Sequence, residues 1–197
     1  MAPSSATRPA RERLLTAAGE LFYESGIAAT GVDAVLARAG VSPATMYAHF
    51  AGKDGLVAAY LEERHTTWRQ TWDAVLAGYR DPVDRLLSVF DAVGRFRQQQ
   101  GNRRGCAFLA AATELPPGHP GQRWLEADSR LLTGRLHELA VAAALPDPAD
   151  VAATLLLCYD GALSGYARAA TTPGLPGDDP VGRARRLAAG WIATRTG

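Results

Sequence analysis

Hydrophobic residues recur along most of the chain at three- and four-residue steps, which is the period of an α-helix. Between residues 9 and 25, for example, Leu14, Ala18 and Phe22 share one face. The sustained two-residue alternation of a half-buried strand is absent from the sequence. The pattern predicts an all-α protein of nine helices. They are expected at about residues 9–25, 30–40, 42–50, 53–79, 81–100, 106–115, 121–144, 147–171 and 180–195.

The most specific pattern is a pair of short helices near the N-terminus. The first has a Thr30-x-x-Asp33 start, close to a capping box, and Gly40 ends it because glycine tolerates positive φ. Ser42 is expected to cap the second helix, and Pro43 suits its first position, where no N–H is needed. Two short helices joined by a glycine-containing turn form a helix-turn-helix, which indicates binding to duplex DNA.

The second of these helices has a small outward face. Met46 and Phe50 are four residues apart and are expected to point inward. Positions 44 and 48, roughly opposite, are both alanine. Such a face can enter a DNA groove, flanked by side chains that can hydrogen-bond to its walls. These flanking residues are Thr45, Tyr47 and His49.

This region resembles the DNA-binding domain of the TetR family of bacterial transcriptional regulators. The resemblance covers roughly the first 60 residues. It rests on Phe22, Gly26 and Thr30, on Ala39-Gly40-Val41-Ser42 at the turn, and on Thr45, Tyr47, His49, Phe50 and Lys53. The resemblance implies a DNA-binding domain at 1–52 with three helices and an effector-binding and dimerisation domain at 53–197 with six. The DNA contacts expected from it and from the motif are Thr30, Ser42, Pro43, Ala44, Thr45, Tyr47, His49 and Lys53.

Among the charged residues, only Lys53 adds support for DNA binding. The net charge is only +1, so indiscriminate coating of nucleic acid is not expected. Lys53 is the only lysine, and it stands at the start of the next helix, where the family pattern has a phosphate contact. Helix N-termini attract phosphate through their free N–H groups. The alternative is a solvated lysine without a role.

The last two helices are expected to form a homodimer interface, as the resemblance implies. The first contains Gly161, Gly165 and Ala169 at four-residue steps, and a row of small residues allows another helix to approach closely. The alternative is ordinary packing within one chain. The candidate interface residues are Cys158, Gly161, Ala162, Gly165, Ala169, Leu187, Ala188 and Trp191.

The C-terminal domain is expected to bind a small, largely apolar effector. It is rich in aromatic and aliphatic residues, and its buried-looking polar groups are few: Glu114, His137, Tyr159, Asp160 and Tyr166. In the family, the effector moves the long fourth helix and so changes the spacing of the two DNA-reading helices. The alternative is that the aromatic side chains only form the core. The candidate ligand contacts are Trp68, Trp72, Phe90, Phe108, Trp124, His137, Tyr159 and Asp160.

No pattern in the sequence favours catalysis, a metal or a cofactor. The four histidines are scattered, and nucleophile-elbow, P-loop and dinucleotide motifs are missing.

Cys106 and Cys158 are expected to be buried thiols of a reducing cytoplasm, although a reactive Cys106 and a disulfide are alternatives. No signal peptide or membrane-length apolar run is visible. We therefore expect a soluble cytoplasmic repressor that binds a palindromic operator as a homodimer and is not an enzyme. The remaining alternatives are a small helical enzyme and a helix-turn-helix protein without an effector.

Overall fold

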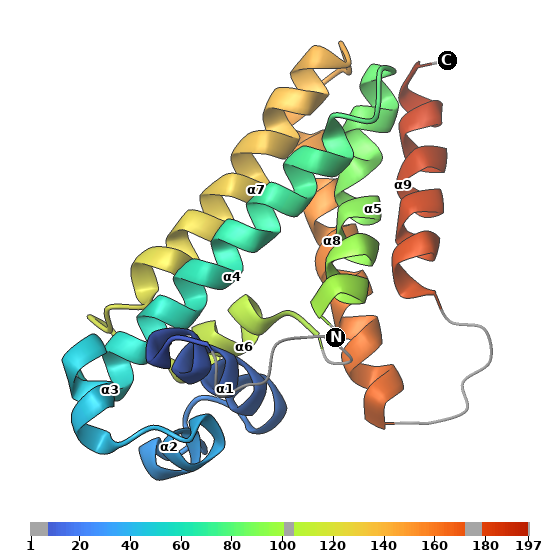
Figure 1. The fold of residues 1–197 in the computed structure, drawn as a ribbon. Coiled ribbons are helices and arrows are strands. Elements are labelled where there is room, and N and C mark those ends of the chain that lie inside the picture. The colour runs from blue at the N-terminus through green and yellow to red at the C-terminus, as the bar shows by residue number, and fades with distance from the viewer. Residues whose placement is uncertain (1–7, 101–104, 172–178, 197) are drawn as a thin grey trace. The chain divides into compact units, whose positions relative to one another are not determined.

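The computed structural model describes residues 8–100, 105–171 and 179–196. These residues form nine helices and no strand, which confirms the all-α prediction (Figure 1). The helices are α1 (Ala10–Ser25), α2 (Val32–Ala39), α3 (Pro43–His49), α4 (Gly52–Leu76), α5 (Pro82–Gln100), α6 (Ala107–Glu114), α7 (Gln122–Ala142), α8 (Pro148–Thr171) and α9 (Pro180–Thr196).

The chain forms two compact units. The first unit consists of residues 1–65 and 107–126, and the second consists of residues 66–106 and 127–197. Helices α4 and α7 therefore each contribute to both units. The predicted boundary between residues 52 and 53 concerns function and stays a prediction.

The first unit packs α1 against α2 and α3. Leu14 and Ala18 on α1, Val35 on α2 and Met46 on α3 are all buried. The ring of Phe22 meets Tyr60 of α4 edge-on at 5.6 Å between centroids. The apolar stripes predicted for these helices are the ones that form the core. As a result, α3 is held firmly on one side and its other side is left exposed.

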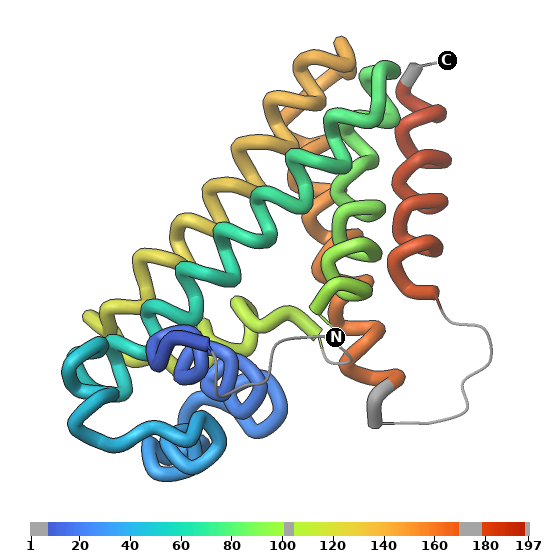
Figure 2. Tube along the Cα trace, in the orientation of Figure 1, coloured from blue at the N-terminus to red at the C-terminus, as the bar shows by residue number. Residues whose placement is uncertain are grey.

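The second unit has a larger hydrophobic core, made from α5, α8, α9 and parts of α4 and α7. Figure 2 shows α9 running beside α5 and α8. Helix α5 begins where the Asp81 carboxylate accepts the backbone N–H groups of Val83 and Asp84, at 2.9 and 3.0 Å. Arg185 of α9 then bonds to Asp84 and Asp91 of α5, at 3.2 and 3.1 Å. Helices α5 and α9 are thus held together by apolar side chains in a shared core and by the ion pairs of Arg185.

Two local predictions need correction. Helix α4 ends at Leu76, three residues before the expected Tyr79. The predicted capping box at the start of α2 is wrong, because Gly31 occupies the N-cap position and no side chain caps that helix.

The predicted breaks at 101–105 and 171–180 lie largely outside the described residues. Within the described ranges, no helix has the length and apolar character needed to span a membrane.

Candidate nucleic-acid interface and effector core

The turn between α2 and α3 has the predicted geometry. Gly40 lies in the left-handed region with φ of 60°, and its N–H bonds back to α2. The Ser42 hydroxyl oxygen accepts the backbone N–H of Thr45 at 3.2 Å, and Pro43 occupies the first turn of α3. The N-cap and the C-cap predicted at this turn are therefore confirmed. Together they fix where α3 starts and how it leaves the turn.

Helix α3 presents a polar and small-residue face away from the core. Met46 is fully buried, whereas the neighbouring Tyr47 is 62% exposed. Pro43, Ala44, Ala48 and His49 are exposed, and Thr45 is half-buried. A short helix with one buried side and one exposed, largely small side has the shape needed to lie in a major groove.

Two of the expected DNA contacts use their side chains within the protein. Thr30 is 4% exposed, and its hydroxyl bonds to the carbonyl oxygens of Gly26 at 2.7 Å and Leu21 at 3.3 Å. This burial argues against a side-chain contact from Thr30 to DNA. The Ser42 hydroxyl is engaged in capping α3 and also lies 2.9 Å from the Thr45 hydroxyl.

Lys53 lies in the first turn of α4, as predicted. It is half-buried, and its ammonium nitrogen is 3.4 Å from the carbonyl oxygen of Ala28 in the α1–α2 turn. The chain there brings a positive charge, the α4 N-terminus and the α1–α2 turn close together. Such a cluster favours an anion such as a DNA phosphate.

The first unit also contains residues 107–126, which the sequence had placed in the effector domain. The Glu114 carboxylate accepts the backbone N–H of Ala28 at 2.6 Å. It also lies close to Gly26, whose φ is 91° and where an added Cβ would be 3.2 Å from a Glu114 oxygen. The ring of His119 accepts the Gly121 N–H at 2.9 Å through Nδ1, and its Nε2 is 3.4 Å from Asp54. This part of the chain is thus joined to the α1–α2 turn and to the start of α4.

The structure divides the predicted ligand contacts between the two units. Trp68, Trp72, Phe90 and Tyr159 lie in the core of the second unit. The Trp68 ring is 5.6 Å from that of Trp72 and 6.1 Å from that of Tyr159. The Trp68 indole N–H is buried and has no hydrogen-bond partner among the described residues. Phe108 and Trp124 belong to the first unit, where both rings lie near His65.

The two polar ligand candidates differ in burial. His137 is exposed on α7. Asp160 is half-buried, and burial raises the pKa of its carboxyl group, with a further contribution from the nearby Asp128. A buried carboxylate without full solvation is costly, so Asp160 is the stronger candidate for contact with a polar group of a ligand.

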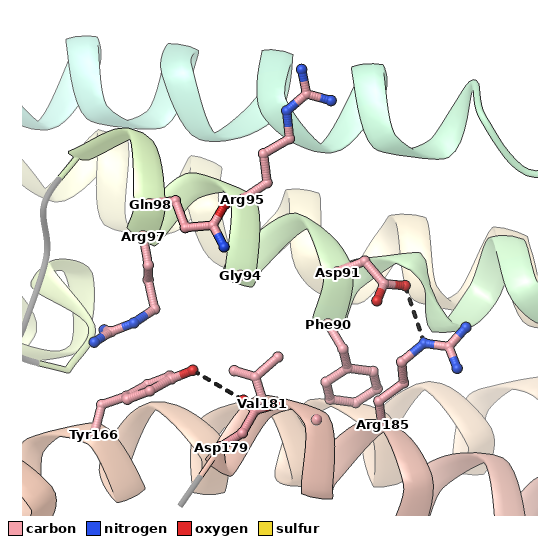
Figure 3. A pocket seen from close by; sticks show the side chains of 11 residues that line it. Phe90, Asp91, Gly94, Arg95, Arg97, Gln98, Tyr166, Asp179, Val181 and Arg185 are labelled. Carbon is pink, nitrogen blue, oxygen red and sulfur yellow. Dashed lines mark hydrogen bonds and ion pairs between the residues drawn. The ribbon is translucent and has the colours of Figure 1, made fainter.

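A pocket of about 790 Å³ opens between α5, α8 and α9 of the second unit (Figure 3). Phe90 is the one predicted ligand contact that lines it. Its polar groups largely pair with one another: Arg185 bonds to Asp91, the Arg97 guanidinium stacks 3.4 Å from the Tyr166 ring centre, and the Tyr166 hydroxyl is 3.5 Å from Asp179. The lining of this pocket mixes charged and apolar groups, and it therefore differs from the largely apolar effector site expected from the sequence.

The predicted dimer residues differ in burial, and three of them, Cys158, Ala169 and Trp191, are half-buried. Ala162 and Ala188 are buried in the core of their own unit, and Gly165 lies so close to Pro180 that an added Cβ would be 2.9 Å from that ring. Gly161 and Leu187 are exposed, with Leu187 at 62%. The sequence had missed Leu157, which is 74% exposed one turn before Gly161. The sequence contained a signal for Leu157, because it lies four residues before Gly161 and so on the same helix face as the row of small residues.

The described residues contain no cluster of three or more side chains that could hold a metal ion. Neither cysteine forms a disulfide with another described residue; both are half-buried, and burial raises the pKa of the Cys158 thiol. A raised pKa keeps a thiol protonated and weakly nucleophilic.

Comparison with known proteins gives matches at both the sequence and the structural level. Residues 14–60 match the family model of bacterial regulatory proteins of the tetR family. The transcriptional regulator UidR of Escherichia coli is 32% identical over 82 residues, which span 42% of this chain and only 38% of UidR.

Two solved structures match over nearly the whole chain. SCO4454, a TetR-family transcriptional regulator from Streptomyces coelicolor, is 28% identical with a TM-score of 0.81, covering 95% of this chain and 96% of that one. SAV143, assigned to the TetR transcriptional regulators of Streptomyces avermitilis, is 31% identical with a TM-score of 0.69, covering 92% and 99%. With the helix-turn-helix geometry described above, these matches show that the chain belongs to the TetR family of transcriptional regulators.

Proposed function

We propose that this regulator is a repressor that binds a palindromic operator as a homodimer and is released by a small effector. Residues 1–52 would read the DNA, and residues 53–197 would bind the effector and form the dimer. The observation that carries the proposal is α3, a short helix with a capped N-terminus, a buried Met46 and an exposed face of small and polar residues.

The proposed DNA contacts are of two kinds. Lys53 and Tyr47 would touch phosphates, which position the protein without reading sequence. Pro43, Ala44 and Thr45 would lie against base edges, where the apolar pair can contact thymine methyl groups. His49 would lie beside them, and Ser42 would act mainly by capping α3. Thr30 is left out because its side chain is buried.

The proposed dimer uses the exposed face of α8 and α9, including Leu157, Gly161 and Leu187. Leu157 and Leu187 are both large apolar side chains that are mostly exposed, and burial of such side chains against a second copy is favourable. A two-fold dimer would place its two α3 helices on half-sites roughly 34–36 Å apart, or a multiple of that spacing.

A matched pair of variants tests the dimer. Leu187→Glu places a charge in the proposed interface and should give a monomer in sedimentation analysis. Val141→Glu is the control, because Val141 is similarly exposed but lies on α7. A Leu187→Glu protein that sediments as a dimer would place the interface elsewhere.

The effector is proposed to be largely apolar and to contact the aromatic cluster of the second unit. Trp68 supports this, since its buried N–H lacks a partner among the described residues and could donate to an acceptor atom of the ligand. A screen of diverse compounds should find apolar or aromatic molecules that quench tryptophan fluorescence, raise the melting temperature and release DNA. A screen in which only highly charged, sugar-like compounds release DNA would contradict an apolar site.

The DNA-binding proposal is tested by selection. The full chain should enrich a two-fold symmetric sequence from a library of random duplexes, with strongly salt-dependent affinity. In a reporter strain, the enriched sequence placed over a promoter should lower transcription. Absence of enrichment, or activation of the reporter, would overturn the corresponding part of the proposal.

A further inference from the structure

Arg13 of α1 bonds to the end of α2. Its Nη1 donates to the carbonyl oxygens of Ala39 and Gly40, both at 3.1 Å. The last carbonyls of a helix have no partner within that helix, and a positive charge near them is favourable because of the helix dipole. Arg13 thus caps the C-terminus of α2 from a different helix.

The two carbonyls belong to the turn that leads into α3. Gly40 takes a left-handed conformation, and the N–H of Val41 bonds back to Leu36 at 3.2 Å. Only Val41 and Ser42 separate Gly40 from the first residue of α3. Small changes in backbone angles at residues 40–42 therefore change the direction of α3. The N–H groups of Gly40 and Val41 bond to carbonyls of α2, and the carbonyls of Ala39 and Gly40 accept from Arg13.

The Arg13 side chain is directed into the protein. Arg13 is partly buried, and its Nε is buried without a hydrogen-bond partner among the described residues. An arginine that neutralises a phosphate normally extends into solvent with its guanidinium exposed. The Arg13 guanidinium is instead anchored to the turn, so its expected effect on DNA binding is geometric.

We propose that Arg13 is a positioning residue for base recognition. It fixes the α2–α3 turn and thereby holds α3 in the orientation that discriminates between base sequences. This inference rests on the proposed function, since it requires that α3 reads bases. It predicts that loss of Arg13 reduces sequence discrimination while binding to phosphates is retained.

The chain supplies a matched control on the same pair of helices. Arg38 of α2 bonds to Glu20 of α1 at 2.7 Å, and both side chains are 48% exposed. Replacing either Arg13 or Arg38 removes one positive charge and one link between α1 and α2. Only Arg13 contacts the carbonyls of the turn. A surface ion pair of the Arg38 kind contributes little to stability.

The experiment measures the affinity of the full chain for two DNA probes over a range of salt concentrations. One probe is a duplex enriched by the wild-type chain from a random library, and the other is a scrambled duplex of the same composition. For Arg13→Gln, the ratio of the two affinities should fall by about tenfold, as expected for loss of hydrogen bonds from a charged group. The affinity for the scrambled duplex should be unchanged. The salt slope, which is the slope of log affinity against log salt concentration, should also be unchanged. Arg38→Gln should leave the affinity ratio unchanged.

A second measurement tests the positioning without DNA. Amide hydrogen exchange at Val41 should be faster in Arg13→Gln than in the wild type and in Arg38→Gln. Arg13→Lys keeps the charge and one donor near the carbonyls, so it should recover part of both the affinity ratio and the exchange protection. If Arg13→Gln fails to fold, Arg13→Lys serves as the test, with a smaller loss in the same ratio expected.

Two results would overturn the inference. An unchanged affinity ratio in a folded Arg13→Gln protein would show that the turn holds α3 without Arg13. A salt slope lowered by about one unit would show instead that Arg13 neutralises a phosphate. If the wild-type chain enriches no sequence, the proposed function fails, and the hydrogen-exchange result still decides whether Arg13 holds the turn.

Discussion

The two compact units both have an apolar core, but they differ in the size of that core and in the contacts that accompany it. In the first unit, single directed contacts to backbone atoms hold the critical turns: Arg13 at Gly40, Ser42 at Thr45 and Glu114 at Ala28. In the second unit, a large apolar core around Trp72 and Phe90 dominates, with ion pairs at its edge. From this difference we expect DNA recognition to depend on the backbone geometry of the first unit, and we expect the second unit to tolerate changes that preserve its volume.

The largest effect is expected when volume is removed from the second unit. Trp72 is fully buried, and its indole N–H donates to the Ser88 hydroxyl at 3.0 Å. Trp72→Ala should lower the free energy of unfolding by about 3–5 kcal/mol, because it leaves a cavity. Urea denaturation measures this change. Trp72→Phe keeps most of the volume, so its loss in free energy of unfolding should be markedly smaller. Equal losses in the two variants would show that buried volume is not what Trp72 contributes to the second unit.

A smaller loss is expected when one directed contact is removed from the first unit. Glu114→Ala removes the acceptor for the Ala28 N–H and should lower stability by about 1–3 kcal/mol. Hydrogen exchange at Ala28 should become faster in this variant. Glu114→Gln keeps a neutral acceptor and should lie between the wild type and Glu114→Ala. Glu138→Ala, at an exposed site on α7, is the control and should change neither quantity. Unchanged exchange at Ala28 in Glu114→Ala would contradict the role of this contact.

The next prediction concerns DNA affinity. Lys53→Ala should weaken binding to enriched and scrambled duplexes alike and lower the salt slope by about one unit. Competition binding at several salt concentrations measures both quantities. Arg13→Gln should give the opposite pattern, with altered discrimination and an unchanged slope. If Lys53→Ala leaves the slope untouched, Lys53 does not contact a phosphate.

The smallest effect is expected at Asp160. Burial raises the pKa of its carboxyl group above 3.8, so the folded state holds this proton more tightly than the unfolded state. The stability from this group is fully present below pH 3.8 and is lost as the pH rises through the raised pKa. Asp160→Asn should therefore be more stable than the wild type at pH 7, by at most about 0.5 kcal/mol, because solvent partly screens the charge of this half-buried group. The difference should vanish below pH 3.8, and a destabilised Asp160→Asn protein at pH 7 would mean that the carboxylate has a favourable partner.

The sequence predicted the elements whose signals are local. Gly40, Ser42 and Pro43 act within a few residues of their own positions, and the structure confirms the turn that they form. Thr30 misled the prediction because its hydroxyl can bond either to the start of α2 or to the carbonyls that end α1. In the folded chain it bonds to Leu21 and Gly26. Sequence spacing alone does not distinguish these two outcomes.

Contacts between residues far apart in the chain could not be predicted from the sequence. Glu114 was interpreted as a polar group of an effector pocket, yet it bonds to Ala28, 86 residues earlier. The contact of Arg13 with the end of α2, 26 and 27 residues later, has no local sequence signal and was not predicted. Ala162 and Ala188 were assigned to the dimer interface because small residues serve close packing both within a chain and between chains. Only the burial of these side chains and the exposure of Leu157 separate the two uses.

The most direct test of the proposed mode of DNA recognition is a hydroxyl-radical footprint of the full chain on its enriched duplex. The account predicts two protected half-sites related by a two-fold axis and separated by roughly 34–36 Å, or a multiple of that spacing. Leu187→Glu should lose both protections at concentrations where the wild type shows them. A single asymmetric footprint, or protection that is the same on any duplex, would contradict a dimeric regulator that reads sequence through α3.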